Sequence, residues 1–447
     1  MDWRLTLEFL VLLGAIAMGA RVGGVGLGLW GAMGLLVLIL GFDIAPANIP
    51  GEVLLIVFTV IMAASAMEVA GGIDFLVRVA ERIIRKNPKQ ITIVAPLVTY
   101  GFTFAAGTGH IVYPLLPVIY EVAHENGIRP ERPMAIATIA SQQAITASPV
   151  SAATAAMIGL LAVHHIGLPQ ILMICVPSTL IAVFIASLVQ LRIGKELKDD
   201  PEYQKRLASG EVKLHSTVGQ GTTTPLKRGA KASAFIFLVG VAIVVLAGIF
   251  PELRTVPGVE KPVILSMPNA IAIVMLAIAA VILTVTKAPV AEVPRSKTCQ
   301  SGVTAIAGIL GLAWLGDTFI SANREMIIGS LSAMAKAAPW TFAIGLFAAS
   351  VLLYSQAATA RALMPLGLSL GIWPFLLIGM FPAVNGYFLL PTYGTIVAAI
   401  NFDRSGTTRI GKYVINHSFL IPGLISTILA VAIGLLIGSL IGNRTPP

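Results

Sequence analysis

Long apolar blocks follow one another along almost the whole chain, with mostly short polar connections between them. The blocks cover residues 5–20, 24–41, 53–70, 90–123, 133–163, 169–191, 232–250, 264–286, 298–316, 339–371, 374–400 and 413–442. About 20 apolar residues are enough for a helix to cross a bilayer, and a helix satisfies its own backbone hydrogen bonds there. The pattern predicts an all-α polytopic membrane protein.

Composition agrees with this class and excludes soluble ones. Of the 447 residues, 56% are hydrophobic and 11% are charged, whereas a soluble domain has about 25% charged residues. Cys175 and Cys299 are too few for a disulfide framework, and no Cys/His spacing typical of zinc occurs. Neither an HExxH motif nor a P-loop is present. We therefore expect no enzyme, no metal and no cofactor.

Two segments have an amphipathic pattern instead of a spanning one. In residues 72–89 the charged side chains recur with helical spacing opposite an apolar face. The charged positions are Arg78, Glu81, Arg82 and Arg85, and the apolar ones are Leu76, Val79, Ala80 and Ile83. The pattern predicts a helix in the membrane interface. Residues 317–338 show a weaker version of the same pattern.

The order of these elements predicts an internal repeat. Each amphipathic segment follows three spans and precedes a long apolar block with a break, then a span interrupted by proline. The first repeat covers residues 1–191, with a hairpin at 90–123 and a broken helix at 133–163. A polar linker at 192–231 joins it to the second repeat, residues 232–447, with a hairpin at 339–371 and a broken helix at 374–400.

Residue pairs at a constant offset of 251 support the repeat. Thr108 pairs with Thr359, His110 with Arg361, and Pro114 with Pro365. The pairs place small, hydroxyl and basic residues at matching positions in the two hairpins.

Basic residues predict the orientation in the membrane. If the N-terminus is outside, 23 of the 30 Lys and Arg residues lie on the cytoplasmic side, as the positive-inside rule requires. The net charge of +9 therefore indicates orientation, and no nucleic-acid partner is expected. The count requires that both hairpins be re-entrant, so that the two repeats have inverted topology and both termini are periplasmic. Inverted repeats are typical of secondary transporters.

Four breaks are the predicted binding region, because irregular backbone at membrane depth occurs where it lines a cavity or is buried in protein. They are the hairpin tips at 107–110 and 355–361 and the proline-interrupted sites at 148–151 and 390–395. The candidate substrate-binding residues are Thr108, Gly109, His110, Ser148, Pro149, Ser151, Ser355, Gln356, Thr359, Arg361, Pro391 and Thr392.

The chemistry of these breaks favours an anion. Half-helix N-termini present unpaired N–H groups, and the helix dipole contributes about 0.3 to 2 kcal/mol for a negative charge. Arg361 is the one basic residue that the predicted topology leaves inside the membrane, where a charge costs at least about 3 kcal/mol. It either contacts the substrate or reaches the interface or an acidic partner elsewhere.

Several stretches resemble the anaerobic C4-dicarboxylate transporter family (Dcu) over essentially the whole chain. They are Gly19-Ala20-Arg21 with Gly23-Gly24, Arg85-Lys86-Asn87-Pro88-Lys89, Ala106-Gly107-Thr108-Gly109, Ala147-Ser148-Pro149, Ser355-Gln356-Ala357-Ala358, Leu390-Pro391-Thr392-Tyr393 and Asp403-Arg404-Ser405-Gly406-Thr407-Thr408. The run Ala313-Trp314-Leu315-Gly316-Asp317-Thr318-Phe319 and the basic residue at 361 look more like the DcuA branch than the DcuB branch.

The resemblance implies transport of fumarate, succinate, malate and aspartate across a bacterial inner membrane. We expect antiport, because exchanging one dianion for another cancels the work against the membrane potential. The rival hypothesis is a cation-coupled anion or amino-acid symporter of the same inverted-repeat type, and a channel or a membrane sensor partner is a third. The expected partners are dicarboxylate anions and the lipid bilayer; a homo-oligomer stays open, because no interface can be located from the sequence.

Overall fold

The computed structural model describes residues 3–22, 25–49, 51–210, 212, 225–256, 263–308, 310–311, 314–323, 338–353, 355–391, 393–411 and 416–442. Helices dominate this part of the chain. In the first half they are α1 (Trp3–Val22), α2 (Gly26–Phe42), α3 (Gly51–Val69), α4 (Gly72–Lys86), α5 (Ile91–Ala106), α6 (Leu116–Glu125), α7 (Glu131–Gln143), α8 (Ala152–Leu161), α9 (Leu168–Gln190) and α10 (Pro201–Ala208). In the second half they are α11 (Ala230–Ile249), α12 (Met267–Thr286), α13 (Lys297–Gly308), α14 (Trp314–Ala322), α16 (Thr341–Leu353), α17 (Gln356–Ser369), α18 (Pro374–Met380), α19 (Gly394–Phe402) and α20 (Leu420–Gly442).

The fold is that of an all-α membrane protein, as predicted. Five described helical segments are long and apolar enough to cross a membrane. They are Glu131–His164, Leu168–Gln190, Ala230–Ile249, Met267–Thr286 and Leu420–Ile441. The bent pair α3 and α4 passes the same test as one span. The described strands are the two-residue pair β1 (Thr255–Val256) and β2 (Val263–Ile264), which are antiparallel.

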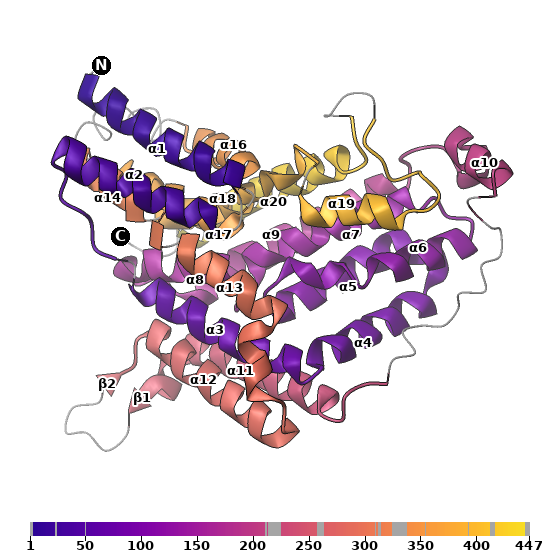
Figure 1. Ribbon diagram of the computed structural model, residues 1–447, viewed down its shortest axis with the longest axis horizontal. Coiled ribbons are helices and arrows are strands. Elements are labelled where there is room, and N and C mark those ends of the chain that lie inside the picture. The colour runs from indigo at the N-terminus through magenta and orange to yellow at the C-terminus, as the bar shows by residue number, and fades with distance from the viewer. Residues whose placement is uncertain are drawn as a thin grey trace.

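The two predicted halves are interleaved. In Figure 1, α1 and α2 lie side by side at one end of the molecule, and α4, α5, α6 and α7 lie together at the other. Helix α3 of the first half packs against α12 of the second, and α9 packs against α20. Neither half therefore forms a separate body.

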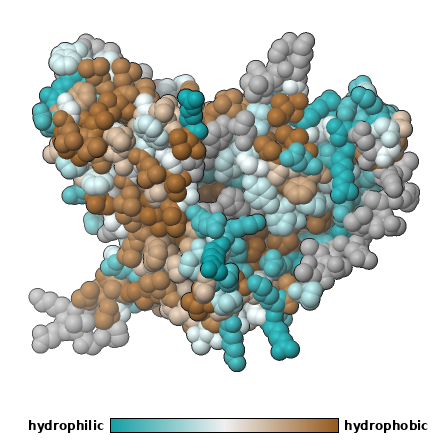
Figure 2. Space-filling model, viewed as in Figure 1, coloured by the Kyte–Doolittle hydropathy of each residue, from teal (hydrophilic) through white to brown (hydrophobic). Residues whose placement is uncertain are grey.

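The outer surface is strongly apolar on one side. Brown side chains cover much of the α1–α2 side in Figure 2, and exposed residues on α2 include Leu29, Leu36 and Leu40. Leu40 is 74% exposed. A patch of this kind indicates contact with lipid acyl chains or another protein, and the hydropathy of the chain favours lipid.

Helix α4 forms where the amphipathic pattern predicts it, but the packed face differs. The bend between α3 and α4 is 73° and is made at Gly71, whose φ of 87° suits glycine. The apolar side chains that are buried are Leu76, Val77, Ala80 and Ile84, whereas Ile83 is exposed. The difference arises because α4 packs against α5, α6 and α11, which a helical pattern cannot indicate.

The linker is partly folded, although its composition predicts a solvated segment. Asp200 caps α10 by accepting hydrogen bonds from the N–H groups of Glu202 and Tyr203. Its carboxylate also accepts a hydrogen bond of 2.6 Å from Arg129, which lies just before α7. Burial by itself raises the pKa of Asp200, but these hydrogen bonds outweigh it and hold the pKa below its ordinary value. The linker is therefore anchored to the first half.

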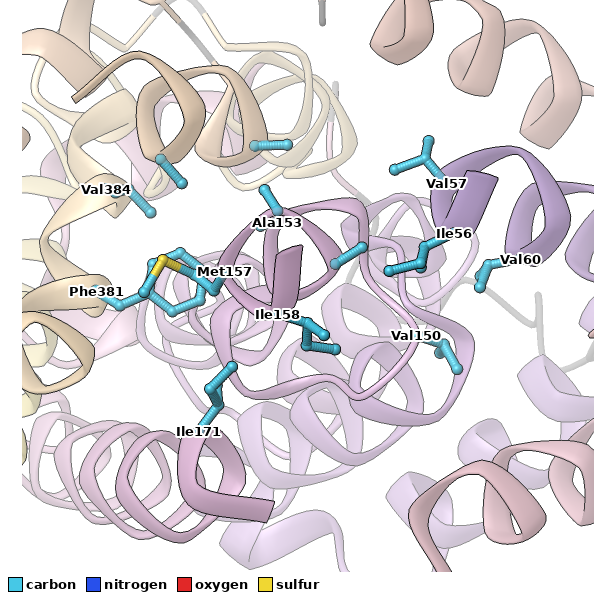
Figure 3. Close-up of a cluster of buried hydrophobic side chains, with 14 of the residues drawn as sticks. Ile56, Val57, Val60, Val150, Ala153, Met157, Ile158, Ile171, Phe381 and Val384 are labelled. Carbon is cyan, nitrogen blue, oxygen red and sulfur yellow. The ribbon is translucent and has the colours of Figure 1, made fainter. Parts of the chain in front are cut away.

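A tightly packed core positions the broken helices. Figure 3 shows α8 between α3 and the 3₁₀ segment η9 (Phe381–Phe388). Val150 lies toward Val60 of α3, and Met157 lies against the ring of Phe381. Because α8 is buried on both sides by large apolar groups, its N-terminal end is held in a fixed place.

Candidate functional site

All four predicted breaks interrupt helices in the structure. In the first half α5 ends at Ala106 and is followed by η2 (Gly109–Val112), and α7 continues as η3 (Ala144–Ala147) and then breaks before α8. In the second half α17 begins directly after Ser355, and η9 is separated from α19. The second tip lies earlier than the constant offset of 251 implies. That offset pairs Thr108 with Thr359, which already lies inside the first turns of α17 because Ser355 starts that helix.

The first hairpin tip packs onto the break of the first broken helix. Gly107 has a φ of 72°, and a Cβ there would lie 2.7 Å from the carbonyl oxygen of Val150. The Ser148 hydroxyl donates a hydrogen bond of 2.7 Å to the carbonyl oxygen of Phe104, near the end of α5. Only glycine fits this close approach, so the two breaks are in direct contact.

A cavity of about 160 Å³ lies at this contact. The predicted residues Thr108 and Ser151 line it on one side. The other walls are an apolar face of α3 and the N-terminal part of α13, including Thr298 and Gly302. The structure thus places two of the candidate residues on one cavity between the breaks and helices of both halves.

Glu68 holds the α13 wall of this cavity. Its carboxylate accepts hydrogen bonds from the backbone N–H groups of Lys297 (3.2 Å) and Thr298 (2.9 Å). A carboxylate at a helix N-terminus is stabilised by the unpaired N–H groups and by the dipole. Glu68 therefore has a structural role at α13.

Most of the predicted hydroxyl groups shape the breaks. Ser151 and Ser355 are N-caps that accept from the N–H groups of Thr154 (3.1 Å) and Ala358 (3.2 Å). The Thr359 hydroxyl donates to the carbonyl oxygen of Ser355 (2.9 Å). These side chains satisfy backbone groups at the starts of the helices and keep the half-helix N-termini in place.

Arg361 is the buried charge that the sequence singles out. It lies on α17 and is 7% exposed. Its Nε and Nη1 atoms have no hydrogen-bond partner among the described residues. Since a buried guanidinium without partners is strongly unfavourable, the arrangement suits an anionic ligand that supplies acceptors.

A cluster of buried amides connects the breaks, and sequence reasoning found one of its members, Gln356. The Gln356 amide nitrogen donates to Gln142 Oε1 (3.0 Å) and Asn385 Oδ1 (3.2 Å). Asn385 donates to Gln143 Oε1 (3.1 Å), and Gln143 donates to the Thr427 hydroxyl (2.9 Å). We call these five residues the amide cluster. The polar triplet Ser141-Gln142-Gln143 inside an apolar block was the signal available for finding it.

The remaining candidates are placed as follows. Gly109 packs against Gln142, since a Cβ there would lie 2.3 Å from the Gln142 amide nitrogen. Pro149 and Pro391 are buried in the two breaks. Thr392 and the side chain of His110 lie outside the part that the structure describes. Gly394, in the second of the proline-interrupted sites, packs against the Tyr113 hydroxyl of the first hairpin, so the second broken helix reaches the first hairpin.

Interrupted helices that meet inside a membrane protein, with a cavity at the first pair of breaks, are the arrangement that secondary transporters use to bind substrate. The class that the fold defines is therefore a membrane transporter. The family model of the anaerobic C4-dicarboxylate membrane transporters DcuA and DcuB matches residues 4–442. The chain belongs to this family, which confirms the resemblance of its motifs.

Individual relatives agree over nearly the full length. The C4-dicarboxylate transporter DcuA of Escherichia coli K12 is 46% identical over 97% of this chain and 99% of its own length. DcuA of Wolinella succinogenes is 45% identical over 98% of this chain and 100% of its own length. The anaerobic C4-dicarboxylate transporter DcuB of Escherichia coli O6:H1 is 39% identical over 98% of this chain and 99% of its own length. Such relatives place the chain as a multi-pass protein of the inner membrane.

Two solved structures share the fold. The YdaH transporter of Alcanivorax borkumensis superimposes with a TM-score of 0.59 at 16% identity, covering 94% of this chain and 99% of its own. MtrF of Neisseria gonorrhoeae, described as one of a class of antimetabolite efflux pumps, gives a TM-score of 0.54 at 12% identity, covering 97% of this chain and 94% of its own. At these identities the likeness concerns the fold alone.

Proposed function

We propose that this protein exchanges C4-dicarboxylates, such as fumarate, succinate, malate and aspartate, across the bacterial inner membrane by antiport. The structural observation that carries the proposal is Arg361, a buried guanidinium with two nitrogen atoms that no described residue pairs. The names of the relatives support the substrate class, because each is called a C4-dicarboxylate transporter over a nearly complete alignment.

The site suits a substrate with two carboxylates. A guanidinium binds a carboxylate with two parallel hydrogen bonds, and Arg361 is positioned on the helix that Ser355 starts. The second carboxylate requires another set of donors, and the first hairpin tip lies beside the cavity, which Gly107 and Thr108 line. Both ends of a short dianion would thus be bound by groups from different halves.

Antiport follows from the energetics of a dianion. Moving two negative charges into a cell against 100 mV costs about 4.6 kcal/mol. When a second dianion leaves on the return step, this electrical work cancels. In our proposal the two repeats have inverted topology. Their hairpins and broken helices form the unit that moves, and the remaining spans form the scaffold.

Counterflow tests this function. Proteoliposomes loaded with unlabelled succinate are expected to take up labelled fumarate or aspartate many times faster than empty ones, because the empty carrier cannot return without a dianion. The measurement is initial uptake of label with and without internal succinate. Equal rates in loaded and empty vesicles would contradict obligate exchange. Uptake into empty vesicles that depends on a sodium or proton gradient would support a cation-coupled symporter instead.

The proposed orientation, with both termini periplasmic, can be tested by labelling. In a protein whose Cys175 and Cys299 are replaced by serine, Ser209→Cys reports on the linker helix and Val163→Cys on the loop after α8. Val163 is 77% exposed, and Ser209 is exposed at the end of α10. A membrane-impermeant maleimide is expected to label Val163→Cys in intact cells and Ser209→Cys only after permeabilisation. The reverse pattern would invert the topology.

A further inference from the structure

In the amide cluster, the hydrogen bonds fix which side chain donates and which accepts. Both N–H groups of the Gln356 amide are used, one to Gln142 and one to Asn385. Both N–H groups of Asn385 are also used, to Gln143 (3.1 Å) and to the carbonyl oxygen of Pro382 (3.1 Å). Because an amide nitrogen can only donate and an amide oxygen can only accept, no side chain in this series can turn over without losing bonds. The cluster is therefore rigid.

Burial strengthens this rigidity. Asn385 is fully buried and Gln142 and Gln143 are 1% exposed, so a broken hydrogen bond would leave an amide without water to replace its partner. An unsatisfied buried polar group costs about 1 to 3 kcal/mol. Asn385 also has non-helical angles inside η9, with φ −96° and ψ 30°. Its hydrogen bonds to Gln143 and Gln356 place its side chain between α7 and α17.

Gln142 lies between the two parts of the proposed site, the first hairpin tip and helix α17. On one side its amide nitrogen lies against Gly109 at the first hairpin tip, 2.3 Å from where a Cβ would be. On the other side its oxygen accepts from Gln356, the first residue of α17. Helix α17 carries Arg361. One glutamine side chain thus separates the hairpin tip from the helix of the buried cation.

A dicarboxylate requires its two donor sets at a separation that matches its length. Each added methylene moves one carboxylate further from the other. A site that fits one length discriminates against a substrate one methylene longer or shorter by about 10- to 200-fold. The residue that fixes the distance between the hairpin tip and α17 therefore decides which length of dicarboxylate the site accepts.

We propose that Gln142 determines the chain-length selectivity of this transporter, by holding the first hairpin tip and the N-terminal end of α17 at a separation that suits four-carbon dicarboxylates. The inference rests on the proposed function and goes beyond it, because it assigns the length discrimination to one side chain and to its hydrogen bond with Gln356. Gln142 is a positioning residue in this account; it acts through the tip and through α17.

The test compares substrates of different length in counterflow. For Gln142→Asn, which withdraws the amide by one methylene, we expect the ratio of succinate uptake to glutarate uptake to fall about 10-fold. Gln356→Asn breaks the same hydrogen bond and is expected to lower the ratio similarly. Gln356→Asn also gives up the hydrogen bond to Asn385. The double variant should be no less selective than Gln356→Asn alone, since both changes remove the bond between Gln142 and Gln356.

A matched control is Gln190→Asn in α9. Gln190 is also a buried glutamine, and neither of its amide atoms has a hydrogen-bond partner among the described residues. Its substitution should leave the ratio at the wild-type value. If Gln142→Asn does not fold, Gln356→Asn decides in the same way.

The outcomes separate this inference from the proposed function. If the wild-type protein exchanges succinate and both amide variants keep its ratio of succinate to glutarate, the role of Gln142 is wrong and the function stands. If the wild-type protein does not exchange succinate, the proposed function fails first. A general loss of rate with an unchanged ratio would assign the amides a purely structural role and overturn the inference.

Discussion

Arg361→Ala is expected to lower the affinity for succinate by about 100-fold, because a hydrogen bond to a charged group contributes about 1.5 to 3 kcal/mol and the guanidinium offers two unpaired nitrogen atoms. The same change should not destabilise the substrate-free protein. It removes a buried charge that has no described hydrogen bond at Nε or Nη1 and whose burial costs at least about 3 kcal/mol. We therefore expect the thermal midpoint without substrate to stay the same or to rise.

Two measurements check this result together. Counterflow reports exchange, and the increase of the thermal midpoint with added succinate reports binding without transport. Arg361→Lys keeps the charge but loses the planar fork, so its affinity should lie between those of the alanine variant and the wild type. Arg192→Ala, at an exposed position after α9, is the control and should behave as wild type. An Arg361→Ala protein that still responds to succinate would show that Arg361 is structural.

Gly107→Ala is expected to reduce exchange by 10-fold or more, while the protein still inserts into the membrane. Its Cβ would lie 2.7 Å from the Val150 carbonyl oxygen and 3.0 Å from the carbonyl carbon. Backbone atoms cannot move aside as a flexible side chain can. The positive φ of 72° adds strain of about 1 to 3 kcal/mol. The hairpin tip should therefore move away from the first broken helix, which distorts the cavity.

The control for this substitution is a glycine inside α5, the helix that ends just before Gly107. A Cβ at Gly101 would meet no atom within 4 Å, so Gly101→Ala should retain wild-type exchange. Initial rates of counterflow at several substrate concentrations distinguish weaker binding from slower turnover. Wild-type kinetics for Gly107→Ala would mean that the contact between the tip and Val150 is dispensable.

The elements that follow from local patterns could be predicted from the sequence. The long apolar blocks predict the spans, and Pro149, Pro391 and the Gly107–Gly109 pair mark breaks that the structure contains. These signals are local, because proline removes a backbone N–H donor and glycine permits a positive φ wherever these residues occur. Arg361 could be singled out for the same reason, as one charge in an apolar segment.

The contacts between breaks could not be predicted in this way. Gln356 and Gln142 are 214 positions apart, and Asn385 and Gln143 are 242 apart. Which amides meet depends on how α7, α17 and η9 pack, and no pattern within one helix contains that information. The exposed Ile83 of α4 shows the same limit, since a periodic pattern gives an apolar face but not the neighbour that covers it.

The close packing of α18 against α20 couples the last helix of the described chain to the second broken helix. A Cβ at Gly379 would lie 2.5 Å from the Gly434 carbonyl oxygen, and one at Gly438 would lie 2.4 Å from that of Phe375. Sliding one helix along the other would bring side chains into a space that only hydrogen atoms fit, so in this structure the start of the second broken helix is fixed against α20. Movement of the second broken helix must therefore either separate α18 from α20 or carry α20 with it, and a fluorophore on the C-terminal end of α20 would distinguish the two.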